Sequence, residues 1–187
     1  MPKAKQSVYQ IKVSLRGIRP PIWRRFQVTG DTSLRKLHEV LQVVMGWGNY
    51  HLFQFIIYGT YFGEPHSDYG SEMKDAQKTR LDGIALGEKT KFIYEYDFGD
   101  SWEHELLVEK ILPVEEGVIY PICLKGKLAC PPEDCGGIWG YADLLKIIRD
   151  PENEEYEEMR KWAGEDFDPE EFDPDEINRM LGSSGYN

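Results

Sequence analysis

Apolar and polar residues alternate along three stretches in the N-terminal third of the chain, at residues 8–15, 22–28 and 51–58. This two-residue period is typical of β-strands, in which successive side chains point to opposite faces. Gly17, Pro20 and Pro21 separate the first two stretches, and these residue types interrupt strands. The pattern therefore predicts three strands.

A helical pattern lies between the second and third predicted strands. Its apolar positions are three, four and three residues apart, at Leu34, Leu37, Leu41 and Val44. This spacing places all of them on one face of a helix. A polar capping residue at positions 31–33 marks the start, and Gly46 or Gly48 marks the end.

Three further helices are predicted in an acidic C-terminal part, residues 139–182, at 141–149, 151–162 and 174–181. Pro151 and Pro174 each follow an aspartate, as an N-cap followed by proline at the first helical position does. Residues 63–80 are poor in apolar side chains and predict an exposed, mobile loop. The expectation is a single α+β domain over residues 1–187, with an antiparallel sheet, one N-terminal helix and this C-terminal helical segment.

A β-hairpin over about residues 92–109 is predicted at the centre of the sheet. A two-residue turn at Gly99 and Asp100 would mix apolar and charged groups on both faces. A three-residue turn at 99–101 instead pairs Phe98 with Trp102 and Tyr96 with His104, and it leaves one face almost wholly apolar. We favour this second register.

The other face of the predicted hairpin carries a row of acids, at Glu95, Asp97, Glu103, Glu105 and Glu109. Like charges opposed across two strands destabilise a sheet unless a positive group lies nearby. The protein's own arginines at positions 16, 19, 24 and 25 can supply it. A divalent cation held by Glu95, Asp97, Glu103 and Glu105 is a second source, and plain solvation of the acids is the third alternative.

A hard cation at this hairpin would suit a metal-dependent hydrolase or nuclease, with Asp97, Asp100, Glu103 and His104 as the candidate catalytic residues. A histidine on an apolar strand face is more often a core residue than a catalyst, and His104 has that position. The same applies to His38 and His51, whereas His66 lies in the polar loop and is expected to be solvated.

Cys130 and Cys135 enclose four residues, the outer limit of zinc-ligand spacing, and Cys123 is the only other cysteine. No second pair of closely spaced ligands follows. Small buried thiols in a tight loop are therefore the preferred interpretation, and zinc at Cys123, Cys130 and Cys135 is the alternative. We expect no cofactor, with a divalent cation as the alternative.

The net charge of −11 hides a gradient along the chain. Residues 1–60 contain nine Lys or Arg against two acids, whereas residues 131–187 contain five against seventeen. The acidic total does not favour nucleic acid as a partner, although the basic end could contact phosphates locally. No apolar stretch is long enough for a signal peptide or a membrane span, so we expect a cytoplasmic protein that makes no use of membranes.

Four separated motifs carry a family resemblance: IRPPIWRR at 18–25, Leu37-His38 with Met45-Gly46-Trp47, YEYDFGDSWEHE at 94–105, and ACPPEDCGGIWGY at 129–141. Together they resemble the plasmid pRiA4b ORF-3-like family over about residues 9–181. The resemblance implies a compact α+β domain. Members resemble passenger genes of plasmids and insertion elements, and some bear a resolvase label, but no catalytic residues follow from the resemblance.

Neither the serine nor the tyrosine recombinase pattern fits this sequence, so we do not expect recombinase activity. We expect a non-enzymatic interaction module with an unknown protein partner, associated with mobile-element or plasmid DNA transactions. The binding candidates are Arg19, Trp23, Arg24 and Arg25, because Arg and Trp are enriched where interfaces bind most strongly. The alternative assigns Trp23 to the core and uses the arginines to neutralise the acidic hairpin face.

Overall fold

The computed structural model describes residues 7–65 and 73–183. Within these residues, eight strands form one sheet in the order β5-β4-β3-β6-β7-β1-β2-β8. The strands are β1 (Ser7–Leu15), β2 (Trp23–Thr29), β3 (Phe53–Ile57), β4 (Thr60–Gly63), β5 (Lys74–Asp75), β6 (Lys91–Tyr96), β7 (Trp102–Pro113) and β8 (Ile122–Lys127). The helices are α1 (Leu34–Met45), α2 (Gly137–Ile148), α3 (Tyr156–Ala163) and α4 (Pro174–Ser183), with a 3-10 turn at Leu81–Gly83.

The prediction of an antiparallel sheet is wrong, although the fold is α+β overall. The sheet is mixed, because β5 pairs in parallel with β4 through Phe62 and Lys74. A two-residue edge strand has too short a pattern to be visible in a sequence. The strand β8 was also not predicted, and it pairs antiparallel with β2 at the opposite edge.

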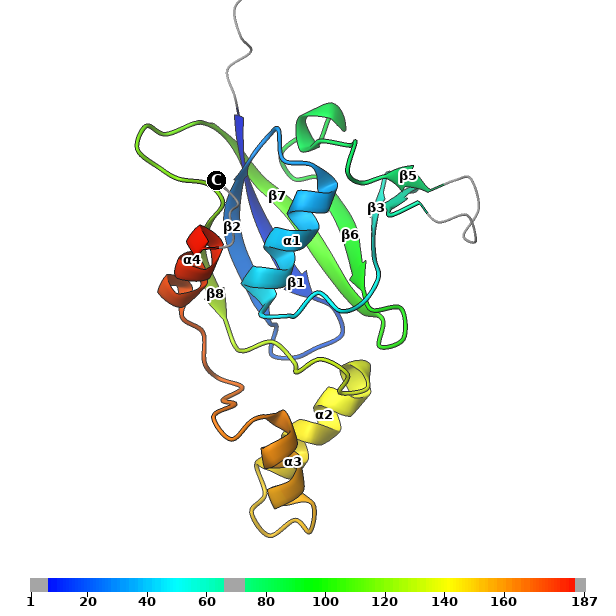
Figure 1. The fold of residues 1–187 in the computed structure, drawn as a ribbon, viewed down its shortest axis with the longest axis vertical. Helices are drawn as coiled ribbons and strands as arrows, with labels where there is room; N and C mark the ends of the chain where they lie inside the picture. The colour runs from blue at the N-terminus through cyan, green and yellow to red at the C-terminus, as the bar shows by residue number, and fades with distance from the viewer. Residues whose placement is uncertain (1–6, 66–72, 184–187) are drawn as a thin grey trace, which may run out of the picture.

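Helix α1 lies across one face of the sheet (Figure 1). Its N-cap is Ser33, whose side-chain oxygen accepts a hydrogen bond from the Lys36 backbone N–H at 3.1 Å. Gly46 ends the helix in the left-handed conformation, with φ 88°. The predicted apolar residues of this helix are all buried against the sheet. Local capping and apolar spacing therefore agree with the tertiary packing.

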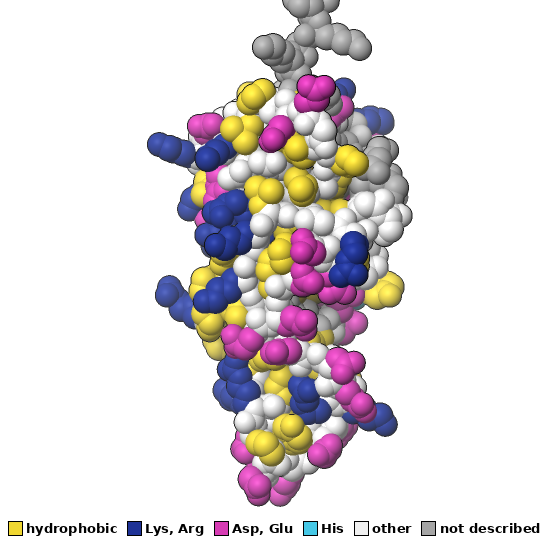
Figure 2. Space-filling view, turned by 90° about the vertical axis from the view of Figure 1, so that its left-hand side faces the viewer, with side chains coloured by type: hydrophobic (Ala, Val, Ile, Leu, Met, Phe, Trp, Pro, Cys, Tyr) yellow, Lys and Arg dark blue, Asp and Glu magenta, His cyan; other side chains and the backbone are white. Residues whose placement is uncertain are grey.

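The C-terminal helices do not cover the sheet as α1 does. Helices α2 and α3 form a pair below the sheet, and α4 lies beside β8 (Figure 1). Acidic side chains crowd the lower end of the molecule in Figure 2. The helix predicted from Pro151 begins only at Tyr156, since the side chains of Asp150 and Asn153 accept backbone hydrogen bonds that hold residues 151–155 in turns.

The predicted hairpin is present as β6 and β7, but its register is wrong by two residues. Tyr96 pairs with Trp102 and Tyr94 pairs with His104, so the loop is five residues long, 97–101. A shift of two keeps each side chain on its predicted face. The loop closes because Ser101 N–H donates to the Asp97 carbonyl at 2.6 Å, and both residues have positive φ, 53° and 56°.

Part of the predicted mobile loop at 63–80, including His66, lies outside the described residues. The described part includes β5 and the buried Ala76, so it contributes to the core. Among the described residues, no helix combines the length and apolar character needed to cross a membrane.

Candidate functional site

The acidic face of the hairpin receives positive partners from within the chain. Glu109 accepts two hydrogen bonds from the Arg25 guanidinium, at 2.6 and 2.7 Å, and this pair holds the pKa of Glu109 below its usual value. Two other acids, which are more exposed than Glu109, also have basic partners: Glu103 pairs with Arg16 at 2.6 Å and Glu105 pairs with Lys91 at 2.9 Å. Glu95 accepts from Gln54 and from Ser101 instead. These acids therefore do not converge on a common point.

Arg24 differs from its neighbours because it points into the core and is only 2% exposed. Its guanidinium donates to the carbonyls of Val44, at 2.8 Å, and Lys127, at 3.0 Å, and it lies over the Phe172 ring. It thus joins β2, α1 and the C-terminal segment. A partner at the outer surface would not reach it.

The other predicted binding residues lie toward solvent. Arg19 is exposed, and Trp23 is half-buried on the outer sheet face. The Trp23 ring is flanked by the Lys12 ammonium at 4.9 Å and by the Arg25 guanidinium at 5.3 Å. Cation–π contacts of this kind cover the ring from within the chain.

Two of the predicted core histidines, His38 on α1 and His104 on β7, are buried between α1 and the sheet. They belong to an aromatic network with Trp47, Phe53, Tyr94 and Tyr96. Burial lowers the pKa of both His38 and His104 to about 4, so both rings are neutral at pH 7. The His38 Nδ1 atom lies 2.8 Å from the Tyr94 hydroxyl and its Nε2 atom 2.6 Å from Asn49 Oδ1. His104 is packed edge-on to Trp47. The structure thus separates His104 from Glu103, which faces Arg16 on the outer side.

The three cysteines are free thiols at separate positions. Burial raises the pKa of Cys123 and Cys130 to about 11 and that of Cys135 to about 12, so all three are protonated at neutral pH. Cys130 lies 3.7 Å from the Met45 sulfur. In the described parts of the chain, these thiols take part in no group of three potential metal ligands.

Three loops meet at one end of the sheet, and we call the meeting point of residues 46–52, 97–101 and 129–136 the loop junction. Gly48 N–H donates to Glu133 Oε2 at 2.9 Å and thereby joins the first and third loops. Gly136 N–H donates to Asp100 Oδ2 at 3.1 Å and joins the second and third. Asp97 N–H donates to the Leu52 carbonyl at 2.9 Å and joins the first and second.

The loop junction is also tied to the core. The Tyr96 hydroxyl donates to Glu133 at 2.5 Å, and burial, together with this hydrogen bond, raises the pKa of Tyr96. Gly137 follows the junction with φ 67°, and a Cβ atom there would lie 2.7 Å from the Asp100 carbonyl oxygen. Only glycine allows this approach between the hairpin loop and the start of α2.

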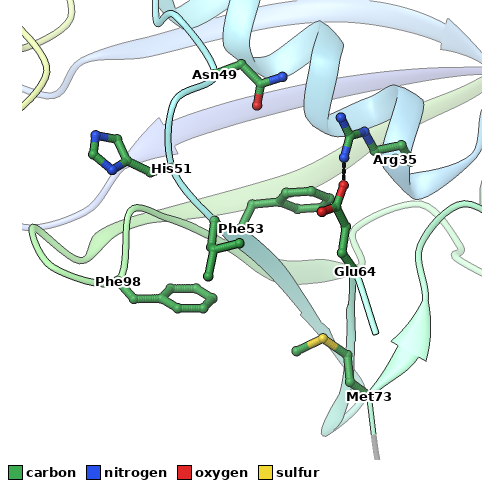
Figure 3. Close-up of a pocket in the computed structure, with 8 residues that line it drawn as sticks. Arg35, Asn49, His51, Phe53, Glu64, Met73 and Phe98 are labelled. Atoms are coloured by element: carbon green, nitrogen blue, oxygen red, sulfur yellow. Dashed lines mark ion pairs between the residues drawn. The ribbon is translucent and has the colours of Figure 1, made fainter. Parts of the chain in front are cut away.

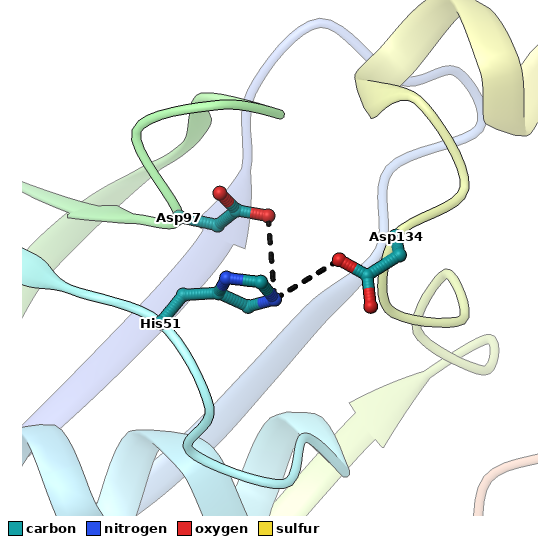
Figure 4. Close-up of side chains that lie close together, drawn as sticks. All are labelled: His51, Asp97 and Asp134. Atoms are coloured by element: carbon teal, nitrogen blue, oxygen red, sulfur yellow. Dashed lines mark ion pairs between the residues drawn. The ribbon is translucent and has the colours of Figure 1, made fainter.

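His51 is placed between two carboxylates at the loop junction (Figure 4). Its Nε2 atom lies 3.0 Å from Asp134 Oδ1 and 3.7 Å from Asp97 Oδ2. This nitrogen is buried, yet among the described residues it has no partner in hydrogen-bond geometry. The Asp97 side chain is 11% exposed, whereas the Asp134 side chain is 68% exposed. Of the candidate catalytic residues, only Asp97 belongs to this group.

Two cavities flank the hairpin loop. The first has a volume of about 170 Å³ and is lined by Asn49, His51 and Phe98 and by the ion pair between Arg35 and Glu64 (Figure 3). The second is a groove of about 700 Å³, which we call the Trp139 groove; it is lined by Arg16, Gly17, Gly99, Asp100, Ser101, Glu103 and residues 136–139. Trp139 in this groove is 79% exposed.

The sequence pattern of the family described as "Plasmid pRiA4b ORF-3-like protein" matches residues 7–176. The chain belongs to this family. The resemblance carried by the four motifs is therefore confirmed. Asp97, Asp100, Asp134 and Trp139 all lie within those motifs, whereas His51 lies outside them.

Two similar proteins extend the comparison of the pRiA4b ORF-3-like chain. The uncharacterized protein y4hQ of Sinorhizobium fredii (strain NBRC 101917 / NGR234) is 37% identical over 177 residues, which cover 94% of this chain and 91% of that protein. The crystal structure of MM3350, a protein of unknown function from Methanosarcina mazei Go1, has a TM-score of 0.85 at 42% identity and covers 92% of this chain and 98% of that chain. These comparisons give the family and the fold.

Proposed function

We propose that this protein is a non-enzymatic interaction module that binds a segment of a partner protein in the Trp139 groove. The observation that carries the proposal is the position of Trp139, a 79% exposed indole in a groove of about 700 Å³. Exposed tryptophans in concave surroundings are frequent anchors of protein interfaces.

The groove is held in shape before any partner arrives. Its hairpin side is fixed by the hydrogen bond from Gly136 to Asp100, and its helix side begins at Gly137, against the Asp100 carbonyl. A preorganised groove loses little conformational freedom on binding, which favours affinity. Arg16 and Glu103, paired at 2.6 Å, add a charged rim that can form hydrogen bonds to a bound segment.

An association with plasmid or mobile-element DNA transactions is part of the proposal and is motivated by the family description. The chain itself carries a net charge of −11, which does not favour direct contact with DNA phosphates. We therefore expect the partner, rather than this chain, to contact DNA.

The test compares the protein with two tryptophan variants. Trp139→Ala removes the groove anchor, and Trp162→Ala is the matched control, because Trp162 on α3 is also exposed, at 48%. A partner captured from the host lysate is identified by mass spectrometry, purified and titrated. We expect Trp139→Ala to weaken its binding by about tenfold or more, the loss that a hot-spot residue causes.

Trp162→Ala should leave the affinity within about twofold of the wild type. Equal affinity of both variants and the wild type for every captured partner would refute the groove as the binding surface, and so would a failure to recover any partner that binds again when purified.

A further inference from the structure

Three potential metal ligands from three distant positions in the sequence meet at the loop junction. His51 precedes β3, Asp97 opens the hairpin loop, and Asp134 precedes α2. One ligand atom from each of them lies within 4.8 Å of the others. Figure 4 shows both carboxylates directed at the same edge of the imidazole ring.

The spacing of these atoms fits a common ion. Metal–ligand bonds of about 2.1 Å in tetrahedral geometry place neighbouring ligand atoms about 3.4 Å apart. The observed separations from His51 Nε2 are 3.0 Å to Asp134 Oδ1 and 3.7 Å to Asp97 Oδ2, one on each side of that value. Small side-chain rotations would bring the atoms to bonding distance of one ion.

Hydrogen bonds within the chain do not occupy all the potential ligand atoms of these three residues. The buried His51 Nε2 has no partner in hydrogen-bond geometry among the described residues. The Asp97 side chain is 11% exposed; its Oδ1 accepts from Gly99 N–H at 2.9 Å, while its Oδ2 faces His51 beyond hydrogen-bond distance. The neighbouring acid Glu133 is already bonded to Tyr96 and Gly48. In the tautomer with the ring proton on Nδ1, His51 Nε2 presents a lone pair that can bind a cation together with the two carboxylates.

We propose that His51, Asp97 and Asp134 bind a divalent transition-metal ion. One imidazole and two carboxylates suit Zn²⁺, Mn²⁺, Co²⁺ or Fe²⁺ better than Mg²⁺ or Ca²⁺, which prefer all-oxygen ligands. The ion connects all three loops of the junction. His51 also lines the cavity of about 170 Å³.

The experiment uses the full chain, freed of metal with a chelator and titrated with Co²⁺ and Zn²⁺ by calorimetry. We expect one ion per chain, and saturation at about a hundredfold excess over Kd to raise the Tm by about 5–10 °C. Bound Co²⁺ should show the visible absorption of a nitrogen and oxygen site, without the thiolate charge-transfer band of a cysteine site.

Asp134→Asn tests an exposed ligand and Asp97→Asn a buried one, and asparagine keeps the size of both side chains. Each should weaken Co²⁺ binding by at least about tenfold, the size of loss already seen when only supporting residues of metal sites are changed. Asp143→Asn, on the surface of α2 and paired with Lys146, is the matched control and should bind like the wild type.

The proposal is overturned if the chain binds no Co²⁺ or Zn²⁺, or if the Asp97 and Asp134 variants keep the wild-type affinity. It is also overturned if the binding is lost on replacing Cys130 and Cys135 by serine while Asp134→Asn has no effect, since the thiols would then hold the ion.

Discussion

The aromatic network beneath α1 and the loop junction both contain histidine, yet they use it differently. In the network, both ring nitrogens of His38 are bonded, to Tyr94 and to Asn49. At the junction, the buried Nε2 of His51 faces two carboxylates without a hydrogen bond in the described structure. In the network, His104 Nε2 is also buried without a hydrogen-bond partner among the described residues, but the His104 ring packs against the rings of Trp47 and Tyr94. The two regions therefore differ in what surrounds the unbonded nitrogen, which is aromatic rings in the network and two carboxylates at the junction.

The largest effect of a single substitution is expected at Arg24, which is buried as the network is but lies outside it. Arg24→Met keeps much of the side-chain volume but leaves the carbonyls of Val44 and Lys127 without their donor. We expect the free energy of unfolding to fall by about 3 kcal/mol or more, because each buried unpaired group costs about 1–3 kcal/mol. Urea denaturation followed by circular dichroism measures it.

Arg25→Met is the matched control, since the ion pair of Arg25 with Glu109 is partly exposed, and pairs of this kind contribute about 1 kcal/mol or less. Similar losses in the two variants would contradict the structural role assigned to Arg24.

The second effect is a loss of stability in acid. The pKa of His38 and of His104 is lowered to about 4 in the folded protein, below the unfolded value of about 6.5. The unfolded chain therefore binds more protons than the folded protein. For this reason the free energy of unfolding has its full value above pH 6.5 and declines as the pH falls toward 4. Between pH 7 and pH 5 we expect a loss of about 2 kcal/mol for each histidine.

Unfolding curves at several pH values test this linkage, and His38→Gln should remove about half of the dependence. A free energy of unfolding that stays constant from pH 7 to pH 5 would show that the two rings are not buried in their neutral form.

A third, smaller effect concerns the connection between the two regions. Glu133→Gln weakens the hydrogen bonds that Glu133 accepts from the Tyr96 hydroxyl and Gly48 N–H. We expect a loss of about 1–2 kcal/mol, since charge-assisted hydrogen bonds are stronger than neutral ones. Hydrogen exchange should rise at the backbone N–H of Gly48. Unchanged exchange and unchanged stability would mean that Glu133 does not anchor the junction.

The smallest effect is expected at the exposed ion pair between Arg16 and Glu103. Their side chains are 53% and 44% exposed, so solvent screens the interaction. Glu103→Gln should change the free energy of unfolding by less than about 1 kcal/mol. A double-mutant cycle with Arg16→Gln measures the coupling, and a larger value would assign this rim a structural role.

The sequence was informative where structure depends on neighbouring residues. Helix α1 could be predicted because its apolar spacing and its Ser33 cap are local signals. The faces of the hairpin were correct because a shift of two residues preserves them. The predicted register was wrong, because the loop begins where Asp97 leaves β6 and its N–H donates to the Leu52 carbonyl, a contact between distant segments.

The candidate site depends on contacts between distant segments more than the helix and the hairpin do. His51, Asp97 and Asp134 come from three loops, and no spacing rule links them in the sequence. Asp97 was a candidate because it lies in the acidic row of the predicted hairpin, and Asp134 had only its place in a family motif as a signal, whereas His51 had none. The strands β5 and β8 were missed for a related reason, since both are edge strands defined by their pairing partners.

The most direct test of the junction as a ligand site is a crystal structure of the protein grown with Mn²⁺, with diffraction data that record anomalous scattering. We expect one strong anomalous peak within bonding distance of His51 Nε2 and of carboxylate oxygens of Asp97 and Asp134. The proposed site would be contradicted if Mn²⁺ occupied other positions in the crystal but gave no peak there. It would also be contradicted if His51 were hydrogen-bonded to both aspartates with no ion between them.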